Sequence, residues 1–342
     1  MRFYLRIQLS LLLSALLLSC AGGNDKQTKV NSKDSGYQVE VAPRSGGKKI
    51  NTDNTIIQPL SLAECNIKGK VKFISFRKYS LGRWNRKVLT AKGYYSYDTS
   101  GYLLCHNEYK SDGIQTIGCI YNYDKNHRAT EWNIMDQGNG RDSKIVFKYG
   151  KKGNKTEEII DDKDPKFSIK ATFKYDSAGD EIQEKDYADD GKLKEIISFR
   201  YDNKGNQTEV SHLAALTHVV QSKFTCTYDD NSNEIAGKKY SSDTAVVVKW
   251  SCKNNDKGKC TEKVYYTTEG YMTMKNTFKY DTIGNLTEYN YFRADGSFNE
   301  DDSYSLEYMY DKTRNVIKQT KVIKRSGKQV LVEYTEYDIV YY

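Results

Sequence analysis

Large and polar residues alternate along most of the chain after residue 60. Residues 277–280 (Thr-Phe-Lys-Tyr) show the pattern clearly, and a period of two is typical of a strand with one covered face. Residues 281–285 (Asp-Thr-Ile-Gly-Asn) follow as a turn signal, since Asp accepts backbone N–H groups and Gly or Asn tolerates positive φ. A second alternating run and a second turn signal, Asp295-Gly296, complete the unit. Each unit therefore predicts two strands joined by tight turns.

This unit recurs along the chain with a period of about 26 residues, as expected of an internal repeat in which each copy contacts its neighbours. The spacing is 26 residues between the first five copies, and a degenerate copy near residue 254 keeps the register. Gly often follows four residues after the repeated Tyr. The repeat positions are Tyr97, Tyr123, Tyr149, Tyr175, Tyr201, Tyr228, Asn254, Tyr280, Tyr310 and Tyr337.

The pattern predicts an all-β fold, because no stretch after residue 60 has a convincing helical period. Repeats of this length give about 20 antiparallel strands, more than the roughly 10 that an open sheet carries without curling. We therefore expect a repeat array of antiparallel β-hairpins forming a long, twisted and curled meander sheet with aromatic residues on its concave side. Residues 59–96 are expected to be capping strands, and residues 330–342 an open edge available to a partner.

The N-terminal residues predict an exported protein. Arg2 and Arg6 precede an apolar run from residue 9 to residue 18, which is too short to span a bilayer and is typical of a signal peptide. The end of the run, Leu17-Leu18-Ser19-Cys20, resembles the lipobox of bacterial lipoproteins. That resemblance implies a lipoprotein signal peptide over residues 1–20 and acylation of Cys20, which would attach the chain to a membrane. Ala21 in place of Asp favours the outer membrane.

Composition divides the mature chain into a tether and a folded body. Residues 21–58 are rich in Gly, Ser, Asn, Asp and Lys, which predicts a flexible tether. Residues 59–342 form the repeat domain. The chain has 29 Tyr, 38% hydrophobic residues and a mean hydropathy of −0.77, which excludes a polytopic helical membrane protein. Its charge of +8 falls to +6 without Arg2 and Arg6, and no Lys/Arg run exceeds two residues, so nucleic-acid binding is not indicated.

The repeated Tyr-x-Tyr-Asp-x-x-Gly-Asn units, which residues 199–206 match with Phe in place of the first Tyr, resemble the YD repeats of the Rhs family. The resemblance covers residues 70–342 and is strongest to the short lipoprotein members of Bacteroidetes type. It implies a β-sheet repeat protein of the cell envelope, periplasmic or surface-exposed. In the large members the repeats wind into a β shell that encloses a cargo. This chain has too few copies to close a large shell, so we do not expect it to enclose a cargo, and the sequence makes no prediction of whether the sheet closes on itself.

Six cysteines other than Cys20 are candidates for disulfide bonds, which an oxidising compartment favours. Cys105 and Cys119 are nearly symmetric about the turn at residues 112–113, and Cys252 and Cys260 about the degenerate turn near residue 256. Each pair could face across its hairpin. Cys226 and Cys252 stand two residues before a repeat position, where most copies have an aromatic ring, so a disulfide could simply replace a ring there. We predict no metal site and no cofactor, because there is no C-x-x-C pair and the four His are scattered.

No catalytic motif stands out, so we expect a protein that is not an enzyme. A Glu recurs in the second strand of most copies, but a catalytic pair needs two special residues rather than one per repeat. Pairing with basic residues on the neighbouring strand explains the column better. The acidic members are Glu131, Glu157, Glu209, Glu262 and Glu288, and the basic ones are Lys148, Lys174, Arg200, Lys253 and Lys279.

The aromatic surface is the remaining candidate for function. Trp84, Trp132 and Trp250 offer flat apolar faces with a polar tip that suit a sugar ring or a peptide. Most other rings are expected to pack on one another. The first hypothesis is a lipid-anchored envelope protein whose repeat sheet binds a glycan or a protein partner. The alternatives are a carbohydrate-active enzyme, which would need converging carboxylates, and an accessory subunit of an outer-membrane assembly, which would need an exposed edge or apolar patch.

Overall fold

The computed structural model describes residues 61–62, 65, 67–81, 86–137, 140–325 and 328–342. These residues form twenty β-strands and one short 3-10 turn, η2 (Pro165–Phe167). The strands are β1 (Val71–Leu81), β2 (Lys87–Tyr97), β3 (Leu103–Lys110), β4 (Gln115–Tyr123), β5 (Ala129–Asp136), β6 (Arg141–Tyr149), β7 (Lys155–Asp162), β8 (Ile169–Tyr175), β9 (Glu181–Ala188), β10 (Leu193–Tyr201), β11 (Gln207–Ala214), β12 (Val220–Tyr228), β13 (Glu234–Tyr240), β14 (Val246–Asn254), β15 (Cys260–Tyr266), β16 (Met272–Tyr280), β17 (Leu286–Arg293), β18 (Phe298–Tyr310), β19 (Val316–Arg325) and β20 (Lys328–Tyr341).

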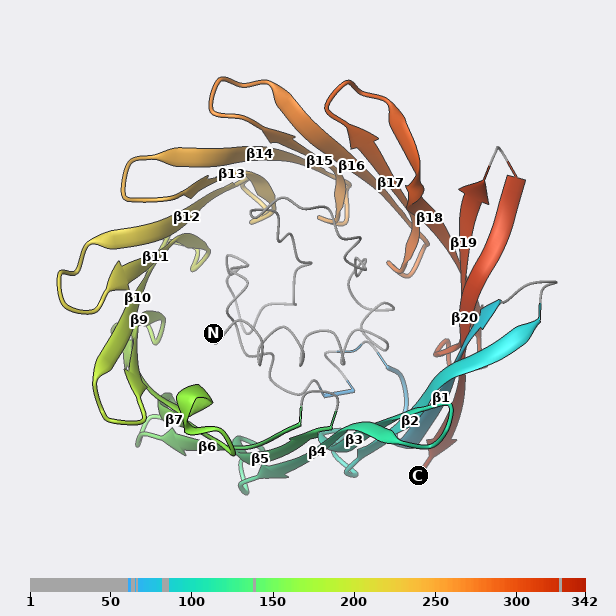
Figure 1. Ribbon diagram of the computed structural model, residues 1–342, viewed down its shortest axis with the longest axis horizontal. Coiled ribbons are helices and arrows are strands. Elements are labelled where there is room, and N and C mark those ends of the chain that lie inside the picture. The colour runs from blue at the N-terminus through green and yellow to red at the C-terminus, as the bar shows by residue number, and fades with distance from the viewer. Residues whose placement is uncertain (1–60, 63–64, 66, 82–85, 138–139, 326–327) are drawn as a thin grey trace.

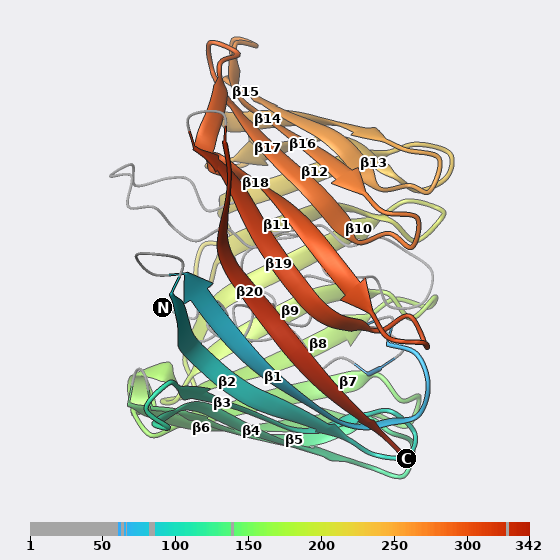
Figure 2. The same ribbon diagram turned by 90° about the vertical axis from the view of Figure 1, so that its right-hand side faces the viewer.

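Every strand pairs antiparallel with the next one along the chain, so the predicted array of hairpins is confirmed. The sheet also closes on itself, because β20 pairs with β1 from Val71↔Tyr341 to Ser80↔Glu333. Figure 1 shows the resulting ring, and Figure 2 shows its strands inclined to the ring axis. Closing a sheet of this width requires such a tilt.

Closure corrects two expectations drawn from the sequence. Residues 330–342 are not an open edge, because β20 has β19 on one side and β1 on the other. The expected capping strands are ordinary members of the ring: β1 pairs with both β2 and β20. The predicted signal peptide and tether lie outside the described residues.

Side chains reinforce the seam where the ends of the sheet meet. The Asn315 amide pairs with the backbone of Lys68, accepting from its N–H at 2.7 Å and donating to its carbonyl at 2.8 Å. The Tyr342 N–H donates to the Lys70 carbonyl at 2.9 Å, and its hydroxyl donates to the Tyr97 carbonyl at 2.6 Å. The contact between the first and last strands therefore does not depend only on the backbone hydrogen bonds between β1 and β20.

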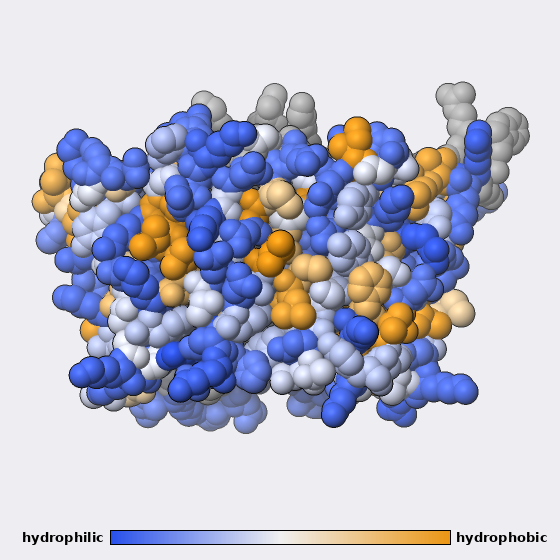
Figure 3. Space-filling model, turned by 90° about the horizontal axis from the view of Figure 1, so that it is seen from below, coloured by the Kyte–Doolittle hydropathy of each residue, from blue (hydrophilic) through white to orange (hydrophobic). Residues whose placement is uncertain are grey.

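The repeated tyrosines lie on the inner face of the ring. Leu62 and Ile67, from the segment that leads into β1, pack in one cluster with Tyr97 and Leu103, and Figure 1 draws that segment inside the ring. The outer face carries the exposed apolar side chains Ile120 and Met135 and the ionic columns. Figure 3 shows small apolar patches among charged groups on the outer side of the strands at the foot of Figure 1.

Four of the predicted cross-strand ion pairs are confirmed on this outer face, whereas Lys174 is opposite Gln183. Lys148 and Glu157 lie 2.8 Å apart, Lys253 and Glu262 2.7 Å, and Arg200 and Glu209 3.5 Å. The lysine and arginine side chains of these pairs are largely solvent-exposed, so each pair contributes little to stability. The repeated carboxylates thus have a structural partner on the strand beside them.

The inner face holds three hydrophobic clusters instead of one central core. The largest lies on β1–β7 and contains the fully buried Trp132, Tyr95 and Tyr121. A second cluster surrounds Val210 on β10–β14, and a third surrounds Tyr289 on β16–β19. A single curved layer of sheet has a thin interior, which explains why this chain can fold with few aliphatic residues.

In most copies the turn after the repeated Tyr is built by the Asp that follows it. In a typical copy, Asp202 Oδ1 accepts the N–H groups of Lys204 and Asn206 at 2.9 and 2.8 Å, and Gly205 has a φ of 79°. Because these carboxylate oxygens are occupied by backbone donors, the turns need no ion to hold their shape. A β-bulge accompanies these turns. In the same copy Arg200 and Tyr201 of β10 are opposite Glu209 and Gln207 of β11, so one extra residue lies on β11 just after the turn.

The repeated tyrosine hydroxyls link consecutive repeats. In six copies the hydroxyl donates to a backbone carbonyl about 20 residues earlier, at the start of the preceding strand, whereas the Tyr310 hydroxyl donates to Asp281 Oδ2 at 2.6 Å. In the degenerate copy the Asn254 amide makes the same bond to the Glu234 carbonyl at 2.7 Å. The bonds run from Tyr123 to Leu103 (2.8 Å), Tyr149 to Ala129 (2.7 Å), Tyr175 to Lys155 (2.9 Å), Tyr201 to Glu181 (2.8 Å), Tyr228 to Gln207 (2.8 Å) and Tyr280 to Cys260 (2.8 Å).

Replacing Tyr201 by Phe should lower the free energy of unfolding by about 1 kcal/mol. The variant loses the bond to the Glu181 carbonyl and the one that the Gln207 amide donates at 3.3 Å. Urea titration measures the change as a shift in midpoint at constant slope. The control is Tyr271→Phe, at a turn residue that is 74% exposed. Equal midpoints for the two variants would contradict this role of the hydroxyl.

Candidate functional site

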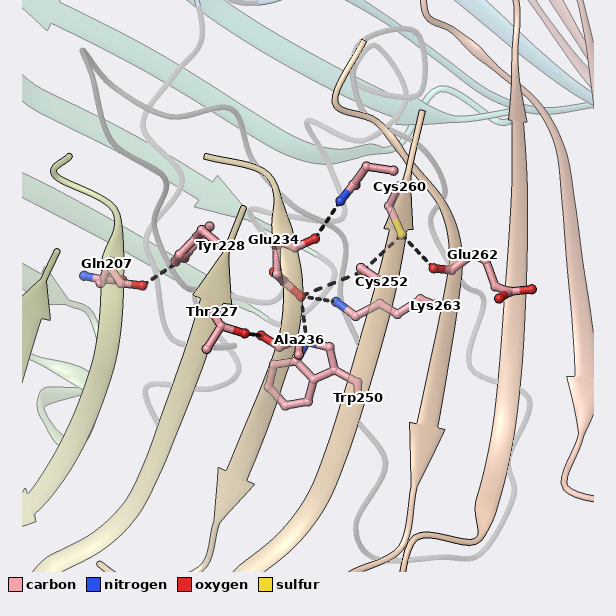
Figure 4. A network of polar contacts seen from close by, with 11 residues as sticks. Gln207, Thr227, Tyr228, Glu234, Ala236, Trp250, Cys252, Cys260, Glu262 and Lys263 are labelled. Carbon is pink, nitrogen blue, oxygen red and sulfur yellow. Dashed lines mark hydrogen bonds and ion pairs between the residues drawn. The ribbon is translucent and has the colours of Figure 1, made fainter. Parts of the chain in front are cut away.

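The strongest departure from the repeat lies on β13–β15. The degenerate copy has Asn254 where other copies have Tyr, and Cys252 where most have an aromatic ring two residues earlier. Cys260 stands at the first position of the next strand, where Leu286 stands in the following copy. These changes are on the inner face and adjoin Trp250, as Figure 4 shows. A site that is not repeated is where a specific function is most readily built.

The Trp250 indole lies over Gly237, which has no side chain to occupy that part of the inner face. The two residues are directly opposed on β14 and β13. A Cβ atom added at Gly237 would lie 2.1 Å from Cζ2 and 2.4 Å from Cε2 of the indole, so any side chain there would displace the ring. Glycine within a strand often marks such a close approach. Trp250 remains half-buried, with part of its ring accessible.

One carboxylate oxygen holds the indole in place. Glu234 Oε1 accepts from Trp250 Nε1 at 2.6 Å and from Lys263 Nζ at 3.1 Å. Cys252 Sγ lies 3.9 Å from the same oxygen. The Glu234 backbone carbonyl accepts in turn from the Asn254 amide at 2.7 Å. Charge-assisted bonds of this kind fix orientation more strongly than neutral ones, so the ring is oriented before any ligand arrives.

One ammonium group lies over the indole. Lys263 precedes Tyr265, the residue opposite Trp250, by two positions, and its Nζ lies 5.4 Å from the Trp250 ring centroid. Lys239, two residues after Gly237, lies over a different ring, with its Nζ 5.5 Å from the Phe224 ring centroid. Such contacts between cations and rings are attractive. The site therefore combines an aromatic face with a positive charge beside it.

The predicted Cys252–Cys260 pair is brought together here. Their Sγ atoms are 3.1 Å apart, and Cys260 Sγ contacts the Glu262 carbonyl at 3.4 Å. Hydrogen bonding to Cys260, and then burial, raises the pKa of the Cys252 thiol well above its usual range. The separation exceeds a disulfide bond of about 2.05 Å, so the structure holds the pair as two thiols. The disulfide itself stays a prediction.

The Cys105–Cys119 pair does not fit the register. Cys105 is opposite Ile120 on the outer face, whereas Cys119 is opposite His106 on the inner face. Cys105 contacts Ser96 Oγ at 3.0 Å, and burial raises the pKa of Cys119 to about 11. A shift of one residue in pairing moves a side chain to the opposite face of a sheet, which is why this predicted bridge is wrong.

The three candidate tryptophans have different surroundings. Trp132 is 0% exposed, packed between Tyr121 and Phe147 in the largest cluster, so its predicted binding role is wrong. Trp84 lies outside the described residues, as does the predicted lipidation site Cys20. Of the two candidate tryptophans that the structure describes, Trp250 keeps the partly accessible ring expected of a binding residue. Sequence reasoning missed Glu234, Gly237 and Lys263, although a Gly within an apolar strand run was a usable signal.

A second group of ionisable side chains lies on the inner face of β9–β11. Asp186 is directly opposite Glu195, and His212 Nδ1 lies 2.9 Å from Glu195 Oε1. Glu184 is on the same face of β9, two residues from Asp186, and all but Glu195 are buried. Within the described residues no three His, Cys, Asp or Glu side chains are grouped so that they could hold a metal ion. In that same part of the chain, no helix is long and apolar enough to cross a membrane.

Comparison with known proteins gives no family model and no curated relative that matches. Among solved structures, the chain is similar to a porin-like protein from Bacteroides uniformis, at 11% identity and a TM-score of 0.34, over 79% of this chain and 96% of that one. It is also similar to TcdB2-TccC3-TEV, at 13% identity and 0.37, over 77% of this chain and 16% of that one. A Tc holotoxin pore from Photorhabdus luminescens matches at 12% identity and 0.29, over 74% of this chain and 15% of that one. The chain thus spans less than a sixth of the length of both toxin structures.

Proposed function

We propose that this chain is a lipid-anchored cell-envelope protein of the YD-repeat, Rhs-like type, and that its closed β wall is a binding module for a carbohydrate polymer. Cys20 would carry the lipid that attaches it to the outer membrane, and Trp250 would contact the polymer. The observation that carries the proposal is the Trp250 indole resting on Gly237 and fixed by Glu234. Nothing in the proposal requires a cofactor or a catalytic step.

The chemistry of the Trp250 site suits a sugar. An indole offers a flat apolar face to the C–H groups of a pyranose ring, with polar groups at its rim for hydroxyls. Glu234 already holds the ring in one orientation, so little side-chain freedom is lost on binding. A ligand on the inner face has to enter the ring, which favours an extended chain over a folded partner.

Replacing Trp250 by Ala should weaken glycan binding about tenfold, which corresponds to roughly 1.4 kcal/mol. The measurement is calorimetric titration of the chain lacking residues 1–20 with the best polymer from a glycan array. Gly237→Ala keeps the indole but displaces it, and should weaken binding similarly. Tyr271→Ala, at an exposed turn residue, is the control. Unchanged binding in both site variants would refute the assignment of Trp250.

The runner-up is a carbohydrate-active enzyme, and the opposed carboxylates of Asp186 and Glu195 are the observation that favours it. An acid and a base on facing carboxyl groups are the usual means of cleaving a glycosidic bond. Release of reducing ends from the bound polymer, lost in Glu195→Gln, would select this function over binding alone.

A further inference from the structure

In the degenerate copy around Asn254, two positions whose side chains touch are both cysteine, Cys252 and Cys260. In the copy that follows, the same two positions hold Phe278 and Leu286, a ring beside an aliphatic chain within one cluster. In the degenerate copy they hold Cys252 and Cys260, with their sulfur atoms 3.1 Å apart. A structural contact alone would be met by any pair of apolar side chains. The joint change to cysteine at both positions points to the chemistry of the sulfur atoms.

The geometry allows a bond between the two sulfur atoms with little movement. Cys260 is directly opposite Asn254, and Cys252 is opposite Lys263, so the two side chains are diagonal neighbours on the inner face. Closing from 3.1 Å to a disulfide of about 2.05 Å requires a shift of roughly 1 Å. Both residues are half-buried, so a reagent in the ring can reach them.

We propose that Cys252 and Cys260 are a thiol–disulfide exchange site, and that its oxidation by an external disulfide locks the hairpin that carries Trp250. One cysteine, as its thiolate, attacks the external disulfide and releases one thiol, leaving a mixed disulfide. The other cysteine then attacks that mixed disulfide and releases the second thiol. The two cysteines lose two electrons and two protons in total, and the external disulfide gains them.

The exchange site is coupled to the candidate binding site through short contacts. Cys252 is two residues from Trp250 on the same face of β14, and its Sγ lies 3.9 Å from the Glu234 oxygen that holds the indole. The bond would also close the turn between β14 and β15, where Asn255 replaces the usual Asp. We infer that the oxidised form holds the indole more rigidly and binds the polymer more tightly. This consequence, unlike the exchange itself, rests on the proposed function.

The other described cysteines provide internal controls. Cys65, Cys119 and Cys226 are buried, and Cys105 lies on the outer face beside Ser96. Cys105 and Cys119 lie on opposite faces of the sheet, so these two cannot join to each other. An internal disulfide formed by exchange with a small disulfide should therefore be confined to Cys252 and Cys260.

The test begins with the chemical state of the thiols in the mature chain. It is incubated in glutathione buffers from fully reduced to fully oxidised, and then alkylated and digested. Peptide mass spectrometry should find Cys252 and Cys260 joined in the oxidised buffer, and Cys105→Ser should not change this. In Cys252→Ser, Cys260 should instead carry glutathione. If both thiols remain alkylatable in oxidised glutathione, or Cys252 is joined to a different cysteine, the proposal is wrong.

The second readout is the effect of the bond. Oxidation should raise the melting temperature, because the bond restricts the unfolded chain. The rise should be only roughly 5 °C, because the loop that the bond closes is short and the domain is large. It should also tighten polymer binding severalfold, and neither change should occur in the Cys252→Ser/Cys260→Ser variant. Equal binding in both redox states, with binding still lost in Trp250→Ala, would overturn the coupling while the proposed function stands. If no polymer binds in either state, the proposed function fails, and the mass and melting data still decide the exchange site.

Discussion

Replacing Trp132 by Ala is expected to lower the free energy of unfolding by about 3–5 kcal/mol, the usual cost of removing a large buried ring. Trp132 is fully buried on the inner face of β5. Its ring centroid lies 5.9 Å from that of Tyr121 and 4.7 Å from that of Phe147, both at steep angles. The cavity left by alanine would separate these rings in the largest cluster of the wall.

Trp132→Phe is the informative comparison for that experiment. Among the described residues, Trp132 Nε1 has no hydrogen-bond partner, so phenylalanine removes a buried donor together with part of the ring. We expect it to cost less than about 1.5 kcal/mol. Urea titrations of the three proteins, followed by circular dichroism, measure both changes. An alanine variant as stable as the original chain would show that the cluster on β1–β7 does not stabilise the ring.

Stability should also fall as the pH is lowered from about 6.5 to 4, because of His106. This side chain is 1% exposed and stacked on Tyr95, with ring centroids 4.4 Å apart. Burial lowers the pKa of His106 from 6.5 to about 4. In the unfolded chain the imidazole takes up a proton near pH 6.5, but in the folded chain only near pH 4. Protons in this range therefore favour unfolding, and the free energy of unfolding falls by up to roughly 3 kcal/mol.

The measurement is the urea midpoint at several pH values between 7.5 and 4.5. His106→Phe keeps a ring against Tyr95 but cannot take up a proton, so its stability should change much less over this interval. His218→Asn is the matched control, at an exposed turn residue with a φ of 55° that asparagine tolerates. It should keep the full pH dependence. Parallel pH profiles for all three proteins would contradict the assignment to His106.

The local part of this fold could be predicted from the sequence because it is set by neighbours in the chain. The period of the tyrosines, the Asp turns and the alternation of each strand act within one hairpin, and the hairpins follow them. Closure could not be predicted in the same way. It depends on twist and stagger accumulated over twenty strands, and no single residue marks it. The contact between Asn315 and Lys68 joins residues 247 positions apart.

In the candidate site, too, the features set by neighbours in the chain could be predicted, and those set by pairing between strands could not. Trp132 and Trp250 are alike in sequence, both on strands and both on the inner face. They differ in what the register places beside them, namely Ile145 next to Trp132 and Gly237 next to Trp250. The cysteine pairs differ in the same way. The register places Cys105 and Cys119 on opposite faces of the sheet, whereas it places Cys252 and Cys260 on the same face with their sulfur atoms 3.1 Å apart. The pairing register between strands decides which tryptophan is accessible and which cysteines are in contact. That register cannot be predicted from the residues taken one at a time.

The pairing of β1 with β20 has a consequence for how the protein reaches its native state. All other strand pairs join neighbours in the chain and can form while synthesis continues, but Val71 meets Tyr341 only at the end. Until then the growing sheet has two unpaired edges, which are open to pairing with other chains. Completion of the ring therefore depends on a contact of very long sequence separation, the kind that slows folding. The interval before the last strand arrives is when this protein is most exposed to aggregation.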